Sequence, residues 1–328
     1  MNLTRTLGRN GPKVSAIGIG CWTIGGLVER EGDRKHGWYG TDDKESIRAI
    51  HRALDLGVTF IDTADIYGIG HSERLLGKAL NGKRDALVIA TKFGKTFDET
   101  TGVRTDAHNE APDYVRWACE QSLRRLQTDR IDLYQLHDGR MDLALVDGLI
   151  DTLEGLVAAG KIRAYGWSTD DPQRAAAFAR GPNCVAVQHK LNVFEDSAEM
   201  LKLCEAKGLA SINRSPLGQG LLTGRFDAQS TFEKFDVRAR WNLSNGKQAA
   251  QLKVLDRVRG LLTGDGRTLV QGALGWILGR SPATIPIPGF RSVAQVEDNC
   301  GVLAKGPLPA SVMAAVEREL AALASDAA

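Results

Sequence analysis

Short apolar segments typical of buried β-strands alternate along this chain with longer segments whose apolar residues have helical spacing. Eight strands are expected, at residues 16–20, 58–62, 87–92, 131–137, 162–168, 185–188, 210–215 and 284–286. Strands that alternate with helices form a parallel sheet, because each helix returns the chain to the starting edge. Eight repeats within 328 residues predict an α/β fold, the (β/α)8 TIM barrel.

Segments outside the repeats complete the expected architecture. Residues 3–15 contain a dense turn cluster between two short strands, which predicts an N-terminal β-hairpin. Residues 27–41 are charged and are expected to form an irregular surface loop, and two extra helices are expected to close the chain. Because no low-complexity linker interrupts the sequence, residues 1–328 are interpreted as a single domain. The alternative is a doubly wound sheet with an appended helical piece.

Composition excludes several classes of protein. Apolar residues make up 43% of the chain and charged residues 25%, which is typical of a soluble globular protein. The formal net charge of +2 argues against nucleic acid or an anionic membrane as a partner, and no apolar run is long enough to span a bilayer. The N-terminus lacks a signal-like apolar core, and the five cysteines form no CxxC pair, so a cytoplasmic location with reduced thiols is expected.

Polar residues follow three consecutive predicted strands. Asp62 ends the strand at 58–62 and Tyr67 follows in a glycine-containing loop, while Lys92 and His137 end the next two strands. In a parallel barrel these ends share one rim, where catalytic groups are found. Each residue also has a structural interpretation: a turn carboxylate, loop packing, a lysine that reaches solvent or a rim histidine. Their coincidence at consecutive strand ends favours a functional site.

Together these four side chains suit proton transfer to an oxygen atom. A phenol has a reference pKa of about 10, and a neighbouring ammonium group favours its ionised form and makes it a better proton donor. Asp62 can hold Lys92 in place, and His137 can orient a carbonyl group. The set is therefore suited to protonating the oxygen on which negative charge develops during carbonyl reduction.

Several motifs resemble those of the aldo-keto reductase superfamily. They are Asp-Thr-Ala-x-x-Tyr-Gly at 62–68, Gly-x-Ser-Glu-x-x-x-Gly at 70–77, Thr-Lys at 91–92, Leu-His at 136–137, Ser-Pro-Leu-Gly-x-Gly-Leu-Leu-Thr-Gly at 215–224 and Gln-x-x-x-Asn at 295–299. The resemblance spans essentially the whole chain. It implies a (β/α)8 enzyme that reduces aldehydes or ketones with NADPH, with Tyr67 as general acid and Asp62, Lys92 and His137 completing a catalytic tetrad.

The same resemblance implies cofactor contacts. Ser168 and Gln188 match positions that hold the nicotinamide carboxamide; Thr169 replaces a common asparagine, and Arg214 replaces a tyrosine that stacks on the nicotinamide. A planar guanidinium can also stack. The remaining expected contacts near the nicotinamide and the pyrophosphate are Gly20, Cys21, Trp22, Asp62, Ser215, Leu217, Gln219 and Gly220.

Residues near the end of the chain are expected to bind the adenosine part of the cofactor. They are Gly289, Phe290, Arg291, Gln295 and Asn299. Arg291 can grip a 2′-phosphate, which favours NADPH over NADH. Gly289 stands where many relatives carry lysine.

Two other functions remain open at this stage. A cofactor-binding regulatory subunit of the potassium-channel β type would use the same fold with little turnover. A metal-assisted barrel hydrolase would use Asp62 and His137, but no H-x-H or H-E-x-x-H pattern supports a metal site. The expected partner is a small carbonyl or alcohol. Trp22, Trp38 and Trp241 are candidates for its pocket, and loop packing is the other interpretation of Trp38.

Overall fold

The centre of the structure is a ring of eight parallel strands. The computed structural model describes residues 3–30 and 34–326. Neighbouring strands of the ring are, in order, β3 (Ile19–Gly20), β6 (Phe60–Asp62), β7 (Val88–Phe93), β10 (Ile131–Leu136), β11 (Ile162–Ser168), β12 (Cys184–Lys190), β13 (Ala210–Arg214) and β14 (Thr284–Pro286). The N–H of Gly18 donates to Pro286 O at 3.0 Å, and that of Gly20 donates to Pro288 O at 3.0 Å. These bonds join the first strand to the last, so the sheet closes into a barrel.

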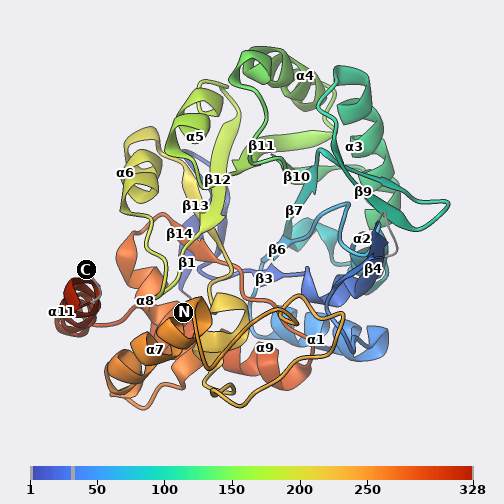
Figure 1. Ribbon diagram of the computed structural model, residues 1–328. Helices are drawn as coiled ribbons and strands as arrows, with labels where there is room; N and C mark the ends of the chain where they lie inside the picture. The colour runs from blue at the N-terminus through green and yellow to red at the C-terminus, as the bar shows by residue number, and fades with distance from the viewer. Residues whose placement is uncertain (1–2, 31–33, 327–328) are drawn as a thin grey trace.

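Helices surround the strands (Figure 1). They are α1 (Asp43–Asp55), α2 (His71–Ala79), α3 (Pro112–Leu126), α4 (Val146–Ala158), α5 (Pro172–Phe178), α6 (Ala198–Lys207), α7 (Lys247–Thr263), α8 (Leu269–Arg280), α9 (Val293–Cys300), α10 (Val302–Lys305) and α11 (Ala310–Asp326). The described residues thus end with three helices after β14 rather than the two expected, and α11 packs against α7. None of the described helices is long and apolar enough to cross a membrane.

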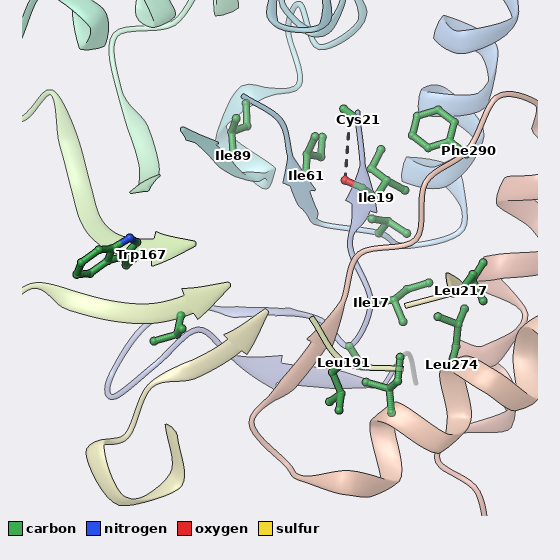
Figure 2. Packing of buried hydrophobic residues seen from close by; sticks show 14 of the residues in the cluster. Ile17, Ile19, Cys21, Ile61, Ile89, Trp167, Leu191, Leu217, Leu274 and Phe290 are labelled. Carbon is green, nitrogen blue, oxygen red and sulfur yellow. Dashed lines mark hydrogen bonds between the residues drawn. The ribbon is translucent and has the colours of Figure 1, made fainter. Parts of the chain in front are cut away.

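The apolar core has two parts. Inward side chains such as Phe60, Leu133 and Ile212 fill the barrel together with Leu7 and Val14 from the N-terminal hairpin, β1 (Thr4–Thr6) and β2 (Lys13–Ser15). The hairpin therefore plugs the amino-terminal end of the barrel. A larger cluster lies between the strands and the helices (Figure 2). Because the two clusters bury both faces of the strands, the strand sequences are nearly continuous apolar runs.

A second sheet, which the sequence analysis did not predict, stands beside the barrel mouth. It is formed by β4 (Leu27–Arg30), β5 (Arg34–Gly37), β8 (Lys95–Asp98) and β9 (Val103–His108). The expectation of an irregular loop at 27–41 was wrong for residues 27–30 and 34–37, which are strands, whereas residues 38–41 are irregular as expected; residues 31–33 lie outside the described residues. These short strands carry many charges, and β4 pairs with β9, whose position is far along the chain. Local sequence therefore contained little sign of the pairing.

Candidate active site

The polarity of the barrel interior changes along the strands. Near the hairpin the inward positions are apolar, and at the carboxyl ends they become polar: Phe60 precedes Asp62, Ala90 precedes Lys92, Leu133 precedes Gln135 and Ala186 precedes Gln188. Side chains two residues apart share one face of a strand. The strand register places Gln135 beside Lys92 and Asp62 beside Ala90, so the polar groups meet at one level.

Lys92 is the centre of this polar group. Its Nζ lies 2.6 Å from Asp62 Oδ1, 2.7 Å from Thr63 O and 3.3 Å from the hydroxyl of Tyr67. Lys92 and Asp62 are both buried. Burial is the largest single influence and opposes the charge on the lysine, but Asp62 and Tyr67 together more than offset it and raise the pKa of Lys92 above its usual value. Lys92 therefore stays charged beneath Tyr67.

The other carboxylate oxygen of Asp62 accepts two side-chain hydrogen bonds. Gln188 Nε2 lies 2.8 Å and Gln135 Nε2 lies 3.2 Å from Asp62 Oδ2. Both amides are buried. A buried carboxylate needs such partners for its remaining lone pairs, and here two neighbouring strands supply them. Asp62 is therefore held in one orientation toward Lys92.

The loop after β6 brings Tyr67 back over Lys92. Asp65 N–H donates to Lys92 O at 3.3 Å and Tyr67 N–H donates to Ala64 O at 3.1 Å, so the loop folds tightly onto β7. Gly68 has a left-handed φ of 63°, and a Cβ there would lie 2.3 Å from Gly25 O. The motif needs glycine at this position because only glycine permits both the conformation and the close approach.

Tyr67 keeps its proton at neutral pH. Its side chain is half-buried on the cleft wall, but its hydroxyl is desolvated, and burial raises its pKa above the usual value of 10.0. Lys92 acts in the expected direction and lowers the pKa, but burial is the larger effect, and Asp62 also raises the pKa. The phenol is thus available as a proton donor, with an ammonium group beside it to stabilise the phenolate that donation would leave.

His137 completes the group as a neutral imidazole. Its ring lies edge-on to Tyr67, with centroids 5.8 Å apart. Burial lowers the pKa of His137 well below 6.5, and the positive charges of Lys95 and Lys92 lower it further. Within the part of the chain that the structure describes, His137 Nδ1 is buried and has no hydrogen-bond partner. A neutral ring with an unused polar atom is suited to hydrogen bonding with a bound ligand.

A cleft of about 1570 Å³ runs from these side chains across the barrel mouth. Its lining includes Tyr67, His137 and Asp62 together with Gly20, Trp22, Ser168, Thr169, Gln188, Arg214, Ser215, Leu217, Gln219, Gly220, Gly289, Phe290, Arg291, Gln295 and Asn299. All of these were expected at the site from the sequence. They are distributed along the chain from Gly20 to Asn299, and the barrel brings them to one rim.

Two expected residues do not line the cleft among those that the structure describes, Lys92 and Cys21. Lys92 lies below Tyr67, with its Nζ 3.3 Å from the Tyr67 hydroxyl. Cys21 points into the core near Ile19, Ile61 and Phe290 (Figure 2), and burial raises the pKa of its thiol. The Cys21 side chain was expected to contact the cofactor, but it lies in the core between the strands and the helices. Successive residues of a strand face opposite sides, so Cys21 points away from the barrel interior, the side that its neighbour Gly20 faces.

Arg214 and Asp170 form an ion pair at the expected nicotinamide end of the cleft. Arg214 ends β13, and Asp170 follows β11, where its other carboxylate oxygen accepts the backbone N–H of Lys190 at 2.7 Å. The guanidinium is therefore held at the cleft wall by a fixed carboxylate. Ser168 on β11 and Gln188 on β12 are aligned in the strand register, and β12 also pairs with β13, the strand that carries Arg214.

The expected adenosine end carries several positive charges. Arg291 is half-buried and donates to Tyr39 O at 2.9 Å, and its backbone N–H donates to Gln295 Oε1 at 2.8 Å. Burial lowers the pKa of Arg291, the charges of Arg238 and Arg225 lower it further, and Asp236 opposes them. Arg225 was not expected from the sequence. An excess of positive charge here fits a bound phosphate.

Residues 225–246 form a strap that contributes to the cleft lining and reaches the second sheet; its backbone runs along the barrel mouth (Figure 1). Val237 N–H donates to Gly37 O at 3.1 Å. Arg238 pairs with Asp236 at 2.7 Å, and its guanidinium lies over the rings of Trp38, Phe226 and Phe232, at 4.9, 5.3 and 4.6 Å from their centroids. The strap is thus fastened to the wall of the cleft.

The three tryptophans expected at the substrate pocket all line the cleft. Trp22 stands 6.3 Å from the Tyr67 ring and 5.3 Å from Trp38, measured between centroids. Trp38 is buried and Trp241 packs edge-on against Phe232 in the strap. Trp22 therefore has the position nearest to the polar group, whereas Trp38 and Trp241 also hold the surrounding loops together.

Sequence reasoning missed several residues at the site. Gln135 binds Asp62, and the alternation along β10, which puts positions 135 and 137 on one face, was the signal that could have found it. Lys95 and Arg104 line the cleft from β8 and β9. No local signal marked them, because the second sheet that presents them was not predicted.

Comparisons with known proteins agree with this geometry. The sequence profile of the Aldo/keto reductase family matches residues 16–320. The chain belongs to this family. Aldo-keto reductase YhdN of Bacillus subtilis is 35% identical over 295 residues, which are 88% of this chain and 84% of that protein. The Schizosaccharomyces pombe protein named aldo-keto reductase yakc [NADP(+)] is 31% identical over 311 residues, 92% of this chain and 86% of that one.

Solved structures of family members have the same fold. The glycerol dehydrogenase AKR11B4 from Gluconobacter oxydans matches with a TM-score of 0.83 at 31% identity, covering 97% of this chain and 95% of that one. An aldo-keto reductase from Klebsiella pneumoniae, solved in complex with NADPH, matches with a TM-score of 0.69 at 27% identity, over 96% and 95% of the two chains. The predicted barrel and the family resemblance are thereby confirmed.

Proposed function

We propose that this family member is an NADP(H)-dependent oxidoreductase whose whole chain acts as one catalytic domain. It reduces an aldehyde or ketone to an alcohol, with Tyr67 as the general acid. The main support for this proposal is the pair of contacts made by Lys92 Nζ, which lies 2.6 Å from Asp62 Oδ1 and 3.3 Å from the Tyr67 hydroxyl. His137 lies beside Tyr67, and both line a long cleft. NADPH supplies the hydride that adds to the carbonyl carbon.

The residues present fit such a cofactor. The cleft is long and continuous, has buried amide and hydroxyl groups at the end near Tyr67, and has Arg291 with neighbouring arginines at the other end. Ser168, Gln188 and Arg214 would hold the nicotinamide, and Arg291 the 2′-phosphate. The relative whose name carries NADP(+) and the neighbour solved with NADPH support the same assignment.

The protein's own groups handle the proton. As the carbonyl carbon accepts the hydride, the carbonyl oxygen takes the proton of Tyr67, which leaves a phenolate next to the Lys92 ammonium. Asp62 holds Lys92 in place, and neutral His137 orients the carbonyl oxygen by a hydrogen bond. The phenolate regains a proton from solvent, so one carbonyl, one NADPH and one proton give one alcohol and one NADP+. The reverse oxidation uses the phenolate as base, a direction supported by the similarity to a protein named glycerol dehydrogenase.

Replacing Tyr67 by phenylalanine tests the proposal. Tyr67→Phe should lower kcat by about a thousandfold or more while leaving the Kd of NADPH within about twofold, because it removes the donated proton and no proposed cofactor contact. Steady-state kinetics on a panel of aldehydes and fluorescence titration with NADPH measure the two quantities. Unchanged turnover would show that Tyr67 is not the general acid.

Tyr134→Phe is a matched control. Tyr134 is buried on the outer face of β10, stacked on Phe93 at 4.4 Å, and its hydroxyl has no hydrogen-bond partner among the described residues. Losing this hydroxyl should leave activity unchanged. If wild-type protein binds NADPH tightly yet turns over no member of the panel, a regulatory cofactor-binding function replaces the one proposed.

A further inference from the structure

The wall of the cleft beside Tyr67 and His137 is built by the second sheet, which is not part of the repeated barrel unit. Lys95 begins β8, directly after the strand that carries Lys92, and Arg104 lies on β9. Both side chains line the cleft together with Tyr67 and His137. Two long cationic side chains thus reach the catalytic end of the cleft from an element added to the barrel.

Positive charge at Lys95 is poorly compensated. Among the side chains that the structure describes, no carboxylate lies within ion-pair distance of Lys95 Nζ, although the lysine is largely removed from water. The charges that act on it most strongly are Arg104, Lys92 and Arg214, all positive. A buried cation without a counter-ion is costly to a protein, and an anionic ligand that supplied the missing charge would relieve that cost.

The nearby carboxylates do not fill this role. Asp65 acts on Lys95, but Asp65 is fully buried and its pKa is raised well above its usual value, so its neutral form is favoured. Asp138 accepts the Arg140 N–H at 2.8 Å and faces His108 at 3.9 Å. Glu110 is desolvated beside Asp138, and its pKa is raised to about 7. None of these three carboxylates therefore forms an ion pair with Lys95.

We propose that Lys95 and Arg104 form an oxyanion subsite, so that the preferred substrate is a short carbonyl compound that also carries a carboxylate or phosphate group. This inference rests on the proposed carbonyl reduction. The carbonyl oxygen lies at Tyr67 and His137, the aliphatic middle of the substrate lies against Trp22, and the anionic end contacts Lys95 and Arg104. An ammonium group and a guanidinium both bind oxyanions well in a partly desolvated site.

Matched substrate pairs test the proposal. We compare kcat/KM for 4-oxobutanoate with butanal, and for glyceraldehyde 3-phosphate with glyceraldehyde, in the wild type and in Lys95→Met. The wild type should prefer at least one anionic member by about tenfold or more, and Lys95→Met should lose about tenfold on that member, mainly through KM, because the lost attraction acts on binding. Butanal should change by less than about twofold. The preferred pair tells whether carboxylate or phosphate is the occupant.

Two further variants make the result specific. Lys95→Arg keeps the charge and should restore most of the preference. Lys161→Met removes one positive charge from the outer surface, where Lys161 pairs with Glu120 at 3.0 Å, and should leave all four substrates unaffected. Equal loss on butanal and 4-oxobutanoate in Lys95→Met, or no anionic preference in the wild type, would overturn the subsite while the reductase function stands.

A binding measurement separates the two proposals. Calorimetric titration of succinate and of inorganic phosphate into NADP+-containing protein should show binding of at least one anion to the wild type and about tenfold weaker binding to Lys95→Met. If binding behaves this way but no carbonyl is turned over, the proposed function fails and the anion subsite stands. If neither anion binds, or both bind Lys95→Met equally well, the subsite is wrong.

The pH dependence provides a last check. Burial and the charges of Arg104, Lys92 and Arg214 lower the pKa of Lys95 to about 8, with Asp65 opposing them. Burial keeps His137 neutral and raises the pKa values of Tyr67 and of Tyr114, whose hydroxyl contacts Lys95 O, so none of these groups becomes charged just above pH 8. Glu110, with a pKa of about 7, is already largely ionised there. Lys95 loses its proton over this range, so the anionic preference should fall above pH 8 in the wild type. Lys95→Arg should keep its preference, and a flat wild-type profile contradicts the assignment.

Discussion

Gln188 donates a hydrogen bond to Asp62, with Nε2 and Oδ2 2.8 Å apart. The residue expected to hold the nicotinamide is therefore attached to the carboxylate that positions Lys92. Gln135 donates to the same oxygen at 3.2 Å but, unlike Gln188, is not part of the described cleft lining. One carboxylate thus joins Gln188, which is proposed to hold the nicotinamide, to the Lys92 that contacts Tyr67, the proposed proton donor.

The two glutamines should have separable effects. Gln188→Leu should weaken NADPH binding and also lower kcat, because it removes both a cofactor contact and a support of Asp62. Gln135→Leu should lower kcat by about tenfold and leave the Kd of NADPH unchanged, since a buried carboxylate loses one hydrogen bond. Titrations and steady-state kinetics on both variants provide the comparison. A similar loss of cofactor affinity in Gln135→Leu would contradict this division of roles.

The Lys92 and Asp62 pair should matter for stability as well as catalysis. Lys92→Met leaves the buried Asp62 carboxylate without its counter-ion, and the free energy of unfolding should fall by about 3–5 kcal/mol. The double variant Asp62→Asn/Lys92→Met removes both charges and should be more stable than Lys92→Met alone. Urea unfolding at pH 7 measures all three proteins. A Lys92→Met midpoint equal to that of the wild type would show that the charge is not isolated from water.

Arg291 should discriminate between the two nicotinamide cofactors. Arg291→Met should raise the Kd of NADPH by about 10- to 100-fold and leave that of NADH nearly unchanged, because the guanidinium is proposed to bind only the 2′-phosphate. Arg257→Met is the control, since Arg257 pairs with Glu319 at 2.7 Å on the outer surface. Parallel losses for both cofactors would mean that Arg291 shapes the cleft rather than recognising the phosphate.

His189 should make stability depend on pH. It is buried on β12, where its ring nitrogens contact Ser211 Oγ at 2.7 Å and Lys190 O at 3.1 Å, and burial lowers its pKa to about 4. Between pH 6.5 and about 4 the unfolded chain binds a proton that the folded chain excludes, so stability falls as pH falls.

A neutral substitute at this position isolates the effect. At pH 5 His189 should lower the free energy of unfolding by about 2 kcal/mol relative to pH 7. His189→Gln removes the titrating group, so the difference between its urea unfolding at pH 7 and at pH 5 should shrink by that amount. An unchanged difference would show that His189 is protonated in the folded protein near its usual pKa.

The sequence by itself determined the barrel and most of the candidate site. Buried parallel strands must be apolar on both faces, and the polar residues Asp62, Lys92 and His137 stand out where those apolar runs end. These apolar runs are visible in the sequence because each strand is buried on both faces, whichever strands it pairs with. The left-handed Gly68 and the loop that returns Tyr67 to Lys92 were likewise encoded in adjacent residues.

Tertiary structure alone decided what surrounds the tetrad. The pairing of β4 with β9 and the contact of Arg238 with the ring of Trp38 join segments that are distant in sequence, so no local pattern reports them. The net pKa of Tyr67 depended on how far burial outweighs Lys92, and that balance exists only in the folded protein. The uncompensated charge of Lys95 has the same origin, because an isolated lysine in a sequence does not reveal which charges will lie near it.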